Sequence, residues 1–397
     1  MELIREKSNR IISNVKTGFR RYLFNEIDWG DRLIIIKGAR GTGKTTMLLQ
    51  HIKIELDEIS DQVLYVSLDD LYFVNHTLSG FVRDFTLLDG KILFLDEVHK
   101  YKNWAKELKN IYDFYPEIKV VATGSSALEI HKSEVDLSRR ASVYDLKEMS
   151  LREYLRLMYE YDFPVLTIEE ILAGHNEIAK SINSQIKPIK YFTEYLRQGA
   201  YPFILEETGK FREKLSAIIN TVIEGDLPAI EKISYETVIK IKKLLMFIAT
   251  SAPFKPNVSE LSQKVMTSRD QLLKYLHLLE RASMISMLKH QGIATSILTK
   301  PEKVYLSNTN LFYPLDQRAN IGSVRETFFQ QQLRVQHHLS YTPRGDFLVD
   351  NKYVFEIGGK DKTNKQIAGI ENAYIAADGI EYGFKNKIPL WMFGFLY

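Results

Sequence analysis

The segment LIIIKGARGTGKTTMLLQHI, residues 33–52, constrains the fold more than any other stretch of this chain. A short apolar run ends in a loop with three glycines, and a lysine, two threonines and a helical pattern follow. Glycine permits tight turns and close approaches that a side chain would block. An apolar strand, a glycine-rich turn and a helix in direct succession predict a βα unit, the building block of a parallel sheet.

The same alternation continues to about residue 150. Besides the strand at 33–37, we expect strands at residues 63–68, 92–96, 119–123 and 142–146, and helices at 44–58, 78–87 and 104–115. Strands without polar alternation, such as residues 92–95, suit a sheet that helices cover on both faces. Residues 1–150 are therefore predicted to form an α/β domain with a parallel sheet.

The loop matches the phosphate-loop (P-loop) pattern G-x-x-x-x-G-K-T, in the strand-to-helix context that the pattern requires. Backbone N–H groups of the curled loop would surround phosphate oxygens, and Lys44 would reach the β- and γ-phosphates. The Thr45 hydroxyl is the expected Mg²⁺ ligand. The predicted ATP-binding residues are Gly38, Ala39, Arg40, Gly41, Thr42, Gly43, Lys44, Thr45 and Thr46, with Arg40 over the edge of the nucleotide or in solvent.

Two acidic residues, Asp96 and Glu97, end the apolar run in KILFLDEVHK. Ligands of open α/β sheets bind at the carboxyl ends of strands. We therefore expect Asp96 to hold Mg²⁺ through water and Glu97 to polarise the attacking water. Thr123 ends another run, and its hydroxyl can touch the γ-phosphate or that water. The serines that follow, Ser125 and Ser126, share this role or cap the next helix.

Arg139 and Arg140 are candidates for the arginine that stabilises transition-state charge on the γ-phosphate, in cis or from a neighbouring subunit. The alternative is a solvated basic pair. An arginine from a neighbour would imply a homo-oligomer, and the sequence leaves the number of subunits open.

Composition narrows the other function classes. The net charge of +3 provides no global field that would draw the chain onto nucleic acid or an anionic membrane. The chain has no cysteine, which excludes disulfides, thiol nucleophiles and cysteine-ligated zinc. We find no signal peptide and no run near the ~20 apolar residues of a membrane span, which predicts a cytoplasmic protein without membrane contact.

Residues 151–397 fall into three segments with different hydrophobic patterns. Residues 151–251 carry helical periodicity throughout and are predicted to be a helical connector. Residues 252–318 hold two helical patterns and paired strand patterns, as in a winged helix-turn-helix. Residues 319–397 begin with a helical pattern and become β-like.

The motifs above, together with VVATGSSAL, LSRR and YDLKEMSLREYL, resemble the bacterial and archaeal ATPases that join an AAA-type domain to a C-terminal region of uncharacterised role. The resemblance continues through RQGAYPFIL, VSELSQKVMTSRDQLLKYLHLLERASMI and GDFLVDNKYVFEIGGKDKTNKQI, so it covers nearly the whole chain. It implies an AAA-type P-loop NTPase domain, a winged helix and an α/β restriction-endonuclease-like C-terminal domain.

The predicted helix-turn-helix could bind DNA. Donors at Arg269, Gln271 and Lys274 stand near the N-terminal end of its second helix, where they could face a groove. The predicted wing adds Lys289, His290 and Lys300, which could touch phosphates. The alternative is a module that packs domains together or binds a protein partner.

In the tail, Asp346 and Glu356 are placed to share a second divalent metal, as in nucleases of the resembled fold. The resembled pattern has a lysine two residues after the second acid, but Gly358 stands there and the lysine arrives only at Lys360. This departure favours an inactive form of the fold that serves binding or dimerisation.

The sequence therefore predicts a Mg²⁺-dependent ATPase whose nucleotide state rearranges a C-terminal module. Two alternatives stay open: a nucleotide-gated DNA- or protein-binding switch with little turnover, and a metal-dependent nuclease at Asp346 and Glu356.

Overall fold

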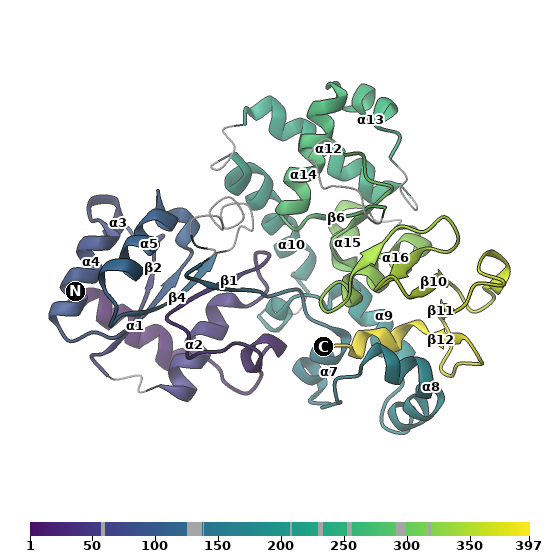
Figure 1. Ribbon diagram of the computed structural model, residues 1–397, viewed down its shortest axis with the longest axis horizontal. Coiled ribbons are helices and arrows are strands. Elements are labelled where there is room, and N and C mark those ends of the chain that lie inside the picture. Colours follow the sequence, from purple (N-terminus) through teal and green to yellow (C-terminus); the bar gives the residue numbers. More distant parts are fainter. Residues whose placement is uncertain are drawn as a thin grey trace. The chain divides into compact units, whose positions relative to one another are not determined.

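The computed structural model describes residues 1–56, 60–124, 137, 139–206, 209–228, 233–251, 256–290, 299–316 and 319–397 (Figure 1). The chain divides into two compact units, Met1–Lys147 and Glu148–Tyr397. This boundary lies close to the predicted one at residue 150. The predicted connector, winged helix and C-terminal domain all fall within the second unit, and the boundaries between them stay a prediction.

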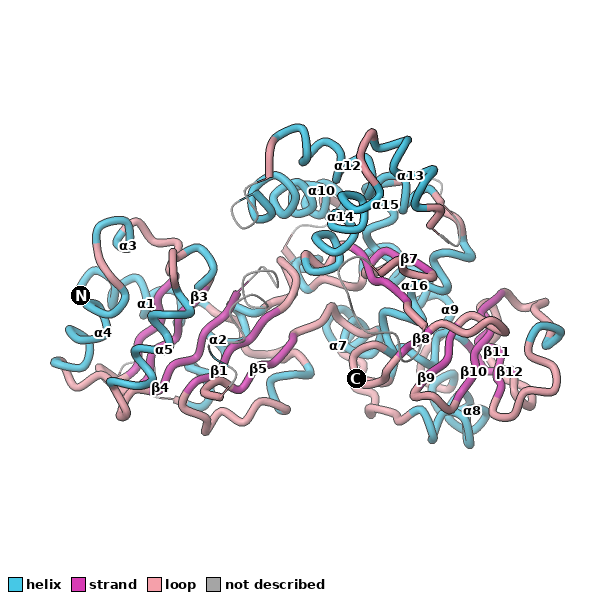
Figure 2. The backbone as a smooth tube through the Cα atoms, turned by 45° about the horizontal axis from the view of Figure 1, so that its top comes forward, coloured by secondary structure: helices cyan, strands magenta, loops and turns pink. Residues whose placement is uncertain are grey.

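The N-terminal unit is built on a parallel sheet with the strand order β2-β3-β4-β1-β5 (Figure 2). The strands are β1 (Leu33–Lys37), β2 (Val63–Ser67), β3 (Ile92–Asp96), β4 (Lys119–Gly124) and β5 (Ser142–Asp145). All five predicted strands are confirmed. Because β4 lies between β1 and β3, the carboxyl ends of these three neighbours bring the glycine loop, Thr123 and Asp96 to one edge of the sheet.

Helices cover both faces of this sheet. They are α1 (Glu2–Asn14), α2 (Lys44–Glu55), α3 (Tyr72–Asn75), α4 (Leu78–Leu87) and α5 (Trp104–Phe114), with 3₁₀ turns η1 (Tyr22–Asn25) and η2 (Val98–Lys100). Successive residues of β1 alternate between two cores: Leu33 and Ile35 pack with α4 and α5, whereas Ile34 and Ile36 pack with α2 and η1. This burial on both sides explains why the strand carries no polar alternation.

The C-terminal unit begins with helices, as predicted. In chain order they are α7 (Leu151–Tyr159), α8 (Ile168–Asn183), α9 (Pro188–Gln198), η3 (Pro202–Leu205), α10 (Phe211–Thr221), the π-helical turn η4 (Val222–Asp226) and α12 (Tyr235–Thr250). Ser150 caps α7 in a capping box with Glu153. The helices α7, α8 and α9 pack against η7 (Leu390–Phe395), near the far end of the chain.

The predicted helix-turn-helix region contains the expected elements in the expected order. These are α13 (Val258–Val265), α14 (Arg269–Arg281) and the antiparallel pair β6 (Ile285–Leu288) and β7 (Lys303–Leu306). Ser268 caps α14 by accepting from the N–H of Gln271. Residues 291–298 of the predicted wing lie outside the described residues, so the winged helix stays a prediction.

A second five-stranded sheet, with the order β12-β11-β10-β9-β8, follows in the tail (Figure 2). It consists of β8 (Leu339–Ser340), β9 (Phe347–Val349), β10 (Tyr353–Gly358), β11 (Ala373–Ala377) and β12 (Lys387–Pro389), with η5 (Thr309–Leu311), α15 (Phe312–Leu315) and α16 (Ile321–Leu333) before it and η6 (Asn364–Gln366) within it. The strands β10, β11 and β12 are parallel, whereas β8, β9 and β10 are antiparallel. The restriction-endonuclease-like assignment stays a prediction.

Candidate functional site

The glycine loop leaves β1 and leads directly into α2, which begins at Lys44. Gly41 and Gly43 adopt φ angles of 86° and 94°, in the left-handed region that favours glycine. A Cβ atom on Gly38 would lie 2.3 Å from the carbonyl oxygen of Leu146. The glycines thus permit both the curl of the loop and its close approach to the segment after β5.

The Lys44 side chain turns back into this loop. Its Nζ donates to the carbonyl oxygens of Gly38 at 2.9 Å and Ala39 at 2.8 Å, and the residue is only 5% exposed. Burial lowers the pKa of Lys44 to about 8, although the carboxylates of Glu97 and Asp96 oppose this shift. The ammonium group therefore lies inside the loop on two backbone carbonyls, with two acids nearby.

Asp96, at the end of β3, is the centre of the polar contacts at this edge. Its Oδ2 accepts from Thr45 Oγ1 at 2.7 Å and from the Tyr65 hydroxyl at 2.9 Å, and its Oδ1 is hydrogen-bonded to Thr123 Oγ1. The residue is buried, and burial together with Asp96 raises the pKa of Tyr65 well above its ordinary value. One carboxylate thus connects α2, β2 and β4.

Glu97 follows Asp96 in a left-handed conformation with φ 54°. Its N–H donates to Thr123 Oγ1 at 3.4 Å, and its Oε2 lies 3.3 Å from Nε2 of the buried His99. Among the carboxylates that act on the Lys44 pKa, Glu97 has the larger effect, ahead of Asp96. Glu97 therefore lies near the loop with His99 as its partner.

This donor set fits Mg²⁺, which prefers hard oxygen ligands. Thr45 and Asp96 offer a hydroxyl and a carboxylate that already contact each other. Among the residues that the structure describes, no three His, Asp or Glu side chains form a metal-binding group. A magnesium ion at Thr45 and Asp96 would therefore complete its shell with water and with phosphate oxygens, as is usual for nucleotide sites.

Arg140 lies at the amino-terminal ends of the strands, opposite the carboxyl ends from which the glycine loop leaves. It precedes β5, which is parallel to β1, whereas the loop follows the carboxyl end of β1. Five strand residues separate the two edges by about 16 Å. The Arg140 guanidinium pairs with Asp113 at 2.8 and 3.0 Å. The prediction of a role in cis is therefore wrong for Arg140 and its neighbour Arg139, and the neighbouring-subunit alternative stays a prediction.

The structure also describes the remaining residues of the predicted loop. Thr42 is fully buried and donates to the carbonyl of Ala39 at 2.9 Å, whereas Thr46 is exposed. Arg40 is partly buried and close enough to contribute to the lowered pKa of Lys44. Ser125 and Ser126 lie outside the described residues.

Sequence reasoning missed three residues of the site, namely Arg21, Tyr65 and His99. Arg21 is buried and donates to the carbonyl oxygens of Thr42 and Lys147, the latter at 2.7 Å. A tyrosine inside an apolar strand, and a histidine two residues after Glu97, were signals that could have been used. Nothing in the sequence around Arg21 indicates its role.

At the predicted second metal site, each of the two acids pairs with a lysine. Asp346 accepts from Lys303 Nζ at 2.9 Å and from the N–H of Ile357 at 2.9 Å, and Glu356 forms an ion pair with Lys362. Lys303 also pairs with the buried Glu326 at 3.2 Å. A metal ion would have to displace these contacts. The second site stays a prediction, without a three-ligand group among the described residues.

The candidate DNA contacts are on the surface. Arg269 and Lys274 are exposed on α14 and Gln271 is partly exposed.

None of the helices in the described part of the chain has the length and apolar content needed to cross a membrane.

Comparison with known proteins agrees with this geometry. Residues 30–155 match a family described as an AAA domain, and residues 189–320 match a domain of unknown function (DUF8612). The parallel sheet and the glycine loop lie within the matched residues, so the N-terminal unit is similar to AAA domains. The match covers just under a third of the chain.

Two relatives that align with most of this chain are described as uncharacterised proteins. An uncharacterised protein of Methanocaldococcus jannaschii is 27% identical over 98% of this chain and 85% of its own length. A second one from the same organism is 22% identical over 85% of this chain and 74% of its own length. A solved structure of AMPPCP-bound DnaA from Aquifex aeolicus aligns at a TM-score of 0.26 and 13% identity, covering 69% of this chain and 88% of that one.

Proposed function

We propose that this protein is a Mg²⁺-dependent ATPase whose nucleotide state rearranges the C-terminal unit. The observation that carries the proposal is the 2.7 Å contact between Thr45 and Asp96 beside the buried ammonium of Lys44. A glycine-rich turn that only connected a strand to a helix would not need an acid, a hydroxyl and a cation at the carboxyl ends of the strands.

Each residue then has a chemical task. The N–H groups of residues 38–43 and the start of α2 bind the phosphates, and Lys44 leaves the carbonyls of Gly38 and Ala39 to contact the β- and γ-phosphates. Thr45 and Asp96 would hold Mg²⁺, which when bound neutralises phosphate charge. Glu97, oriented by His99, accepts a proton from the attacking water.

The test is ATP binding and phosphate release by the full-length chain. Lys44→Ala should abolish binding, because the loop loses its cation. Glu97→Gln should still bind ATP but lose roughly 10²-fold or more in turnover, because it lacks the base. Lys102→Ala, which changes an exposed lysine outside the loop, is the matched control. Equal binding by Lys44→Ala and wild type, or equal turnover by Glu97→Gln and wild type, would refute the proposal.

A second candidate is a nucleotide-gated DNA-binding switch with little turnover. It is favoured by the position of Arg140, which leaves the isolated chain without that arginine at its own loop, and by the exposed Arg269 and Lys274 on α14. If α14 contacts phosphates, duplex affinity should fall steeply with salt and drop further in Lys274→Ala. Lack of duplex affinity at low salt, with and without ATP, would exclude the DNA version and leave a protein partner.

A further inference from the structure

The segment that leaves β5 runs alongside the start of the glycine loop. The N–H of Leu146 donates to the carbonyl oxygen of Lys37 at 2.8 Å, and the carbonyl of Leu146 lies where any side chain on residue 38 would clash. Tyr22 adds further contacts, because its hydroxyl donates to the carbonyl of Asp145 at 3.2 Å and accepts from the N–H of Lys147 at 3.4 Å. Residues 145–147 are therefore fixed against the loop.

Arg21 connects the two segments directly. One arm of its guanidinium donates to the carbonyl of Thr42 inside the loop, and the other donates to the carbonyl of Lys147, the last residue of the N-terminal unit. The residue is only 4% exposed. A planar guanidinium fixes the spacing of two acceptors, which an ammonium cannot do. A shift of the Thr42 peptide would therefore also strain the hydrogen bond to the Lys147 peptide.

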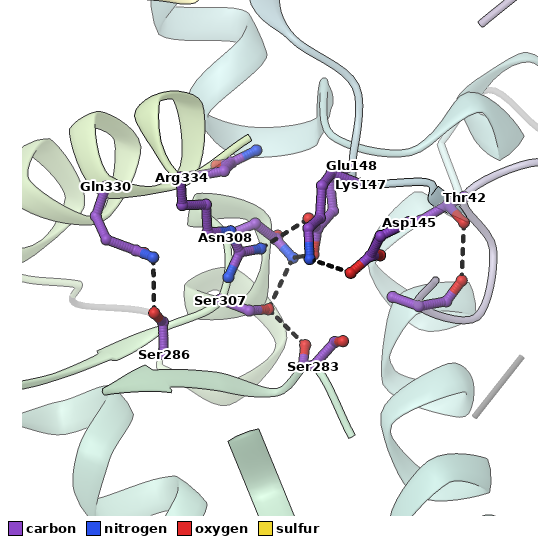
Figure 3. A network of polar contacts seen from close by, with 12 residues as sticks. Thr42, Asp145, Lys147, Glu148, Ser283, Ser286, Ser307, Asn308, Gln330 and Arg334 are labelled. Atoms are coloured by element: carbon purple, nitrogen blue, oxygen red, sulfur yellow. Dashed lines mark hydrogen bonds and ion pairs between the residues drawn. The ribbon is translucent and has the colours of Figure 1, made fainter. Parts of the chain in front are cut away.

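The next residue is held just as firmly in the other unit. Glu148 is 2% exposed, and its carboxylate accepts from Arg334 at 2.8 Å and from Asn308 at 3.3 Å (Figure 3). Its carbonyl accepts from the Tyr397 hydroxyl at 2.9 Å. Residue 147 thus belongs to one packed unit and residue 148 to the next.

Nucleotide binding should change the contacts of Lys44 inside the glycine loop. Lys44 now donates to the carbonyls of Gly38 and Ala39, and it has to release them to reach a phosphate. The freed peptides are part of the loop that Arg21 holds at Thr42. The loop, Arg21 and Lys147 form one connected path from the phosphate site to the first residue of the C-terminal unit.

We propose that Arg21 is a positioning residue that couples occupancy of the glycine loop to the orientation of the C-terminal unit through the Lys147–Glu148 junction. This inference rests on the proposed ATP binding. It assigns the coupling to hydrogen bonds on the two carbonyl oxygens, and not to any contact of Arg21 with the nucleotide.

The chain has no cysteine, so two dyes can be attached at introduced sites, Lys91→Cys in the N-terminal unit and Ser181→Cys in the C-terminal unit, both exposed. Energy transfer between the dyes is measured in the full-length chain with and without a non-hydrolysable ATP analogue and Mg²⁺. In parallel, affinity for a fluorescent ATP analogue is measured. We expect a nucleotide-dependent change in energy transfer in the otherwise wild-type chain.

Arg21→Lys should lose most of that change while its nucleotide affinity falls by no more than about tenfold, the scale of one ordinary intramolecular hydrogen bond. Arg20→Lys, at the exposed neighbouring arginine, should behave as wild type. Glu148→Gln should also reduce the change, with nucleotide affinity unaltered, and it serves where Arg21→Lys fails to fold. A full response in both variants, or nucleotide binding without any change in the wild type, would overturn the coupling alone. Absence of nucleotide binding in the wild type would overturn the ATPase proposal as well.

Discussion

The Tyr65 hydroxyl and the Thr45 hydroxyl donate to the same oxygen of Asp96, at 2.9 and 2.7 Å. Tyr65 belongs to β2, one strand further from the loop than β3, so it acts as an outer support that orients the carboxylate. Removal of such supports typically costs at least about tenfold in metal affinity or activity. We expect Tyr65→Phe to raise the Mg²⁺ concentration needed for half-maximal turnover by about tenfold. Tyr72→Phe is the control, and an unchanged Mg²⁺ dependence in Tyr65→Phe would argue against an orienting role.

His99 is predicted to act on turnover and not on binding. Its imidazole lies 3.3 Å from the Glu97 carboxylate, and the ring is buried. His99→Ala should lower kcat by about tenfold, within the range of a general base that has lost its alignment, while ATP affinity stays at the wild-type value. Steady-state phosphate release measures the change in kcat, and equilibrium nucleotide binding measures the affinity for ATP. A loss of affinity with unchanged kcat would show that His99 supports the fold of the loop instead.

The lowered pKa of Lys44 predicts a pH-dependent affinity. In the free protein the ammonium loses its proton as pH rises through about 8, whereas the nucleotide-bound form should retain it because phosphate favours the charged state. Protons are then taken up on binding above pH 8, so the dissociation constant should rise about tenfold per pH unit there and stay flat below. Titration with a non-hydrolysable ATP analogue between pH 7 and 9.5 measures this. Lys44→Arg keeps its charge, so an inflection near pH 8 in that variant would assign the effect to another group.

Arg139 and Arg140 lie at the edge opposite the loop of their own chain, so any contribution to turnover must come from a second copy. An arginine at the γ-phosphate contributes about 10³-fold or more to phosphoryl transfer. The Arg139→Ala/Arg140→Ala double variant and Lys44→Ala should each be inactive alone, but their mixture should recover part of the wild-type rate. Turnover should also rise with protein concentration. Complementation that fails while the wild type is active would remove these arginines from the mechanism.

Lys303 is predicted to be a main stabilising residue of the C-terminal unit. It is 6% exposed at the side chain and pairs with Glu326 and Asp346, whose attraction outweighs the opposing effect of burial and raises the pKa of Lys303. Lys303→Met leaves buried carboxylates without a counter-charge, which should cost about 3–5 kcal/mol of stability. Thermal unfolding followed by circular dichroism measures the loss, and Lys300→Met, at an exposed lysine, should be neutral.

The same experiment bears on the predicted second metal site. With Lys303 and Lys362 on the carboxylates of Asp346 and Glu356, wild-type melting without nucleotide should be the same in Mn²⁺ and in EDTA. A clear rise in Mn²⁺ would show that the metal displaces the lysines, and it would favour the nuclease hypothesis.

The strands and the loop could be predicted because their signals are local. Burial on both faces makes β1 apolar throughout, and left-handed φ angles at Gly41 and Gly43 favour glycine. The convergence of Tyr65 on Asp96 could not be predicted, because it depends on which strands are neighbours. The position of Arg140, in contrast, follows from the predicted parallel sheet, because a residue just before the strand at 142–146 lies at the end of the strands opposite the loop.

The pairing of Lys303 with Asp346 could not be predicted from the sequence either. The two residues are 43 positions apart; Lys303 lies in β7, whereas Asp346 lies just before β9 of another sheet. The lysine sought after Glu356 at position 358 is replaced by Lys362, which reaches the same carboxylate from a loop. A spacing rule for one strand cannot find a cation that arrives from another element.

The packing of η7 has a consequence for synthesis on the ribosome. Ser150 and Arg152 donate to the carbonyl of Tyr397 at 2.7 and 2.9 Å, and the N–H of Leu166 donates to the carbonyl of Phe395. Residues 148–166 therefore form these contacts only after partners more than two hundred residues later have been translated. The five described strands of the N-terminal sheet, in contrast, have all been translated once the ribosome has passed residue 147. We expect the N-terminal unit to be folded, and its glycine loop formed, while the helices that follow it are still exposed to chaperones.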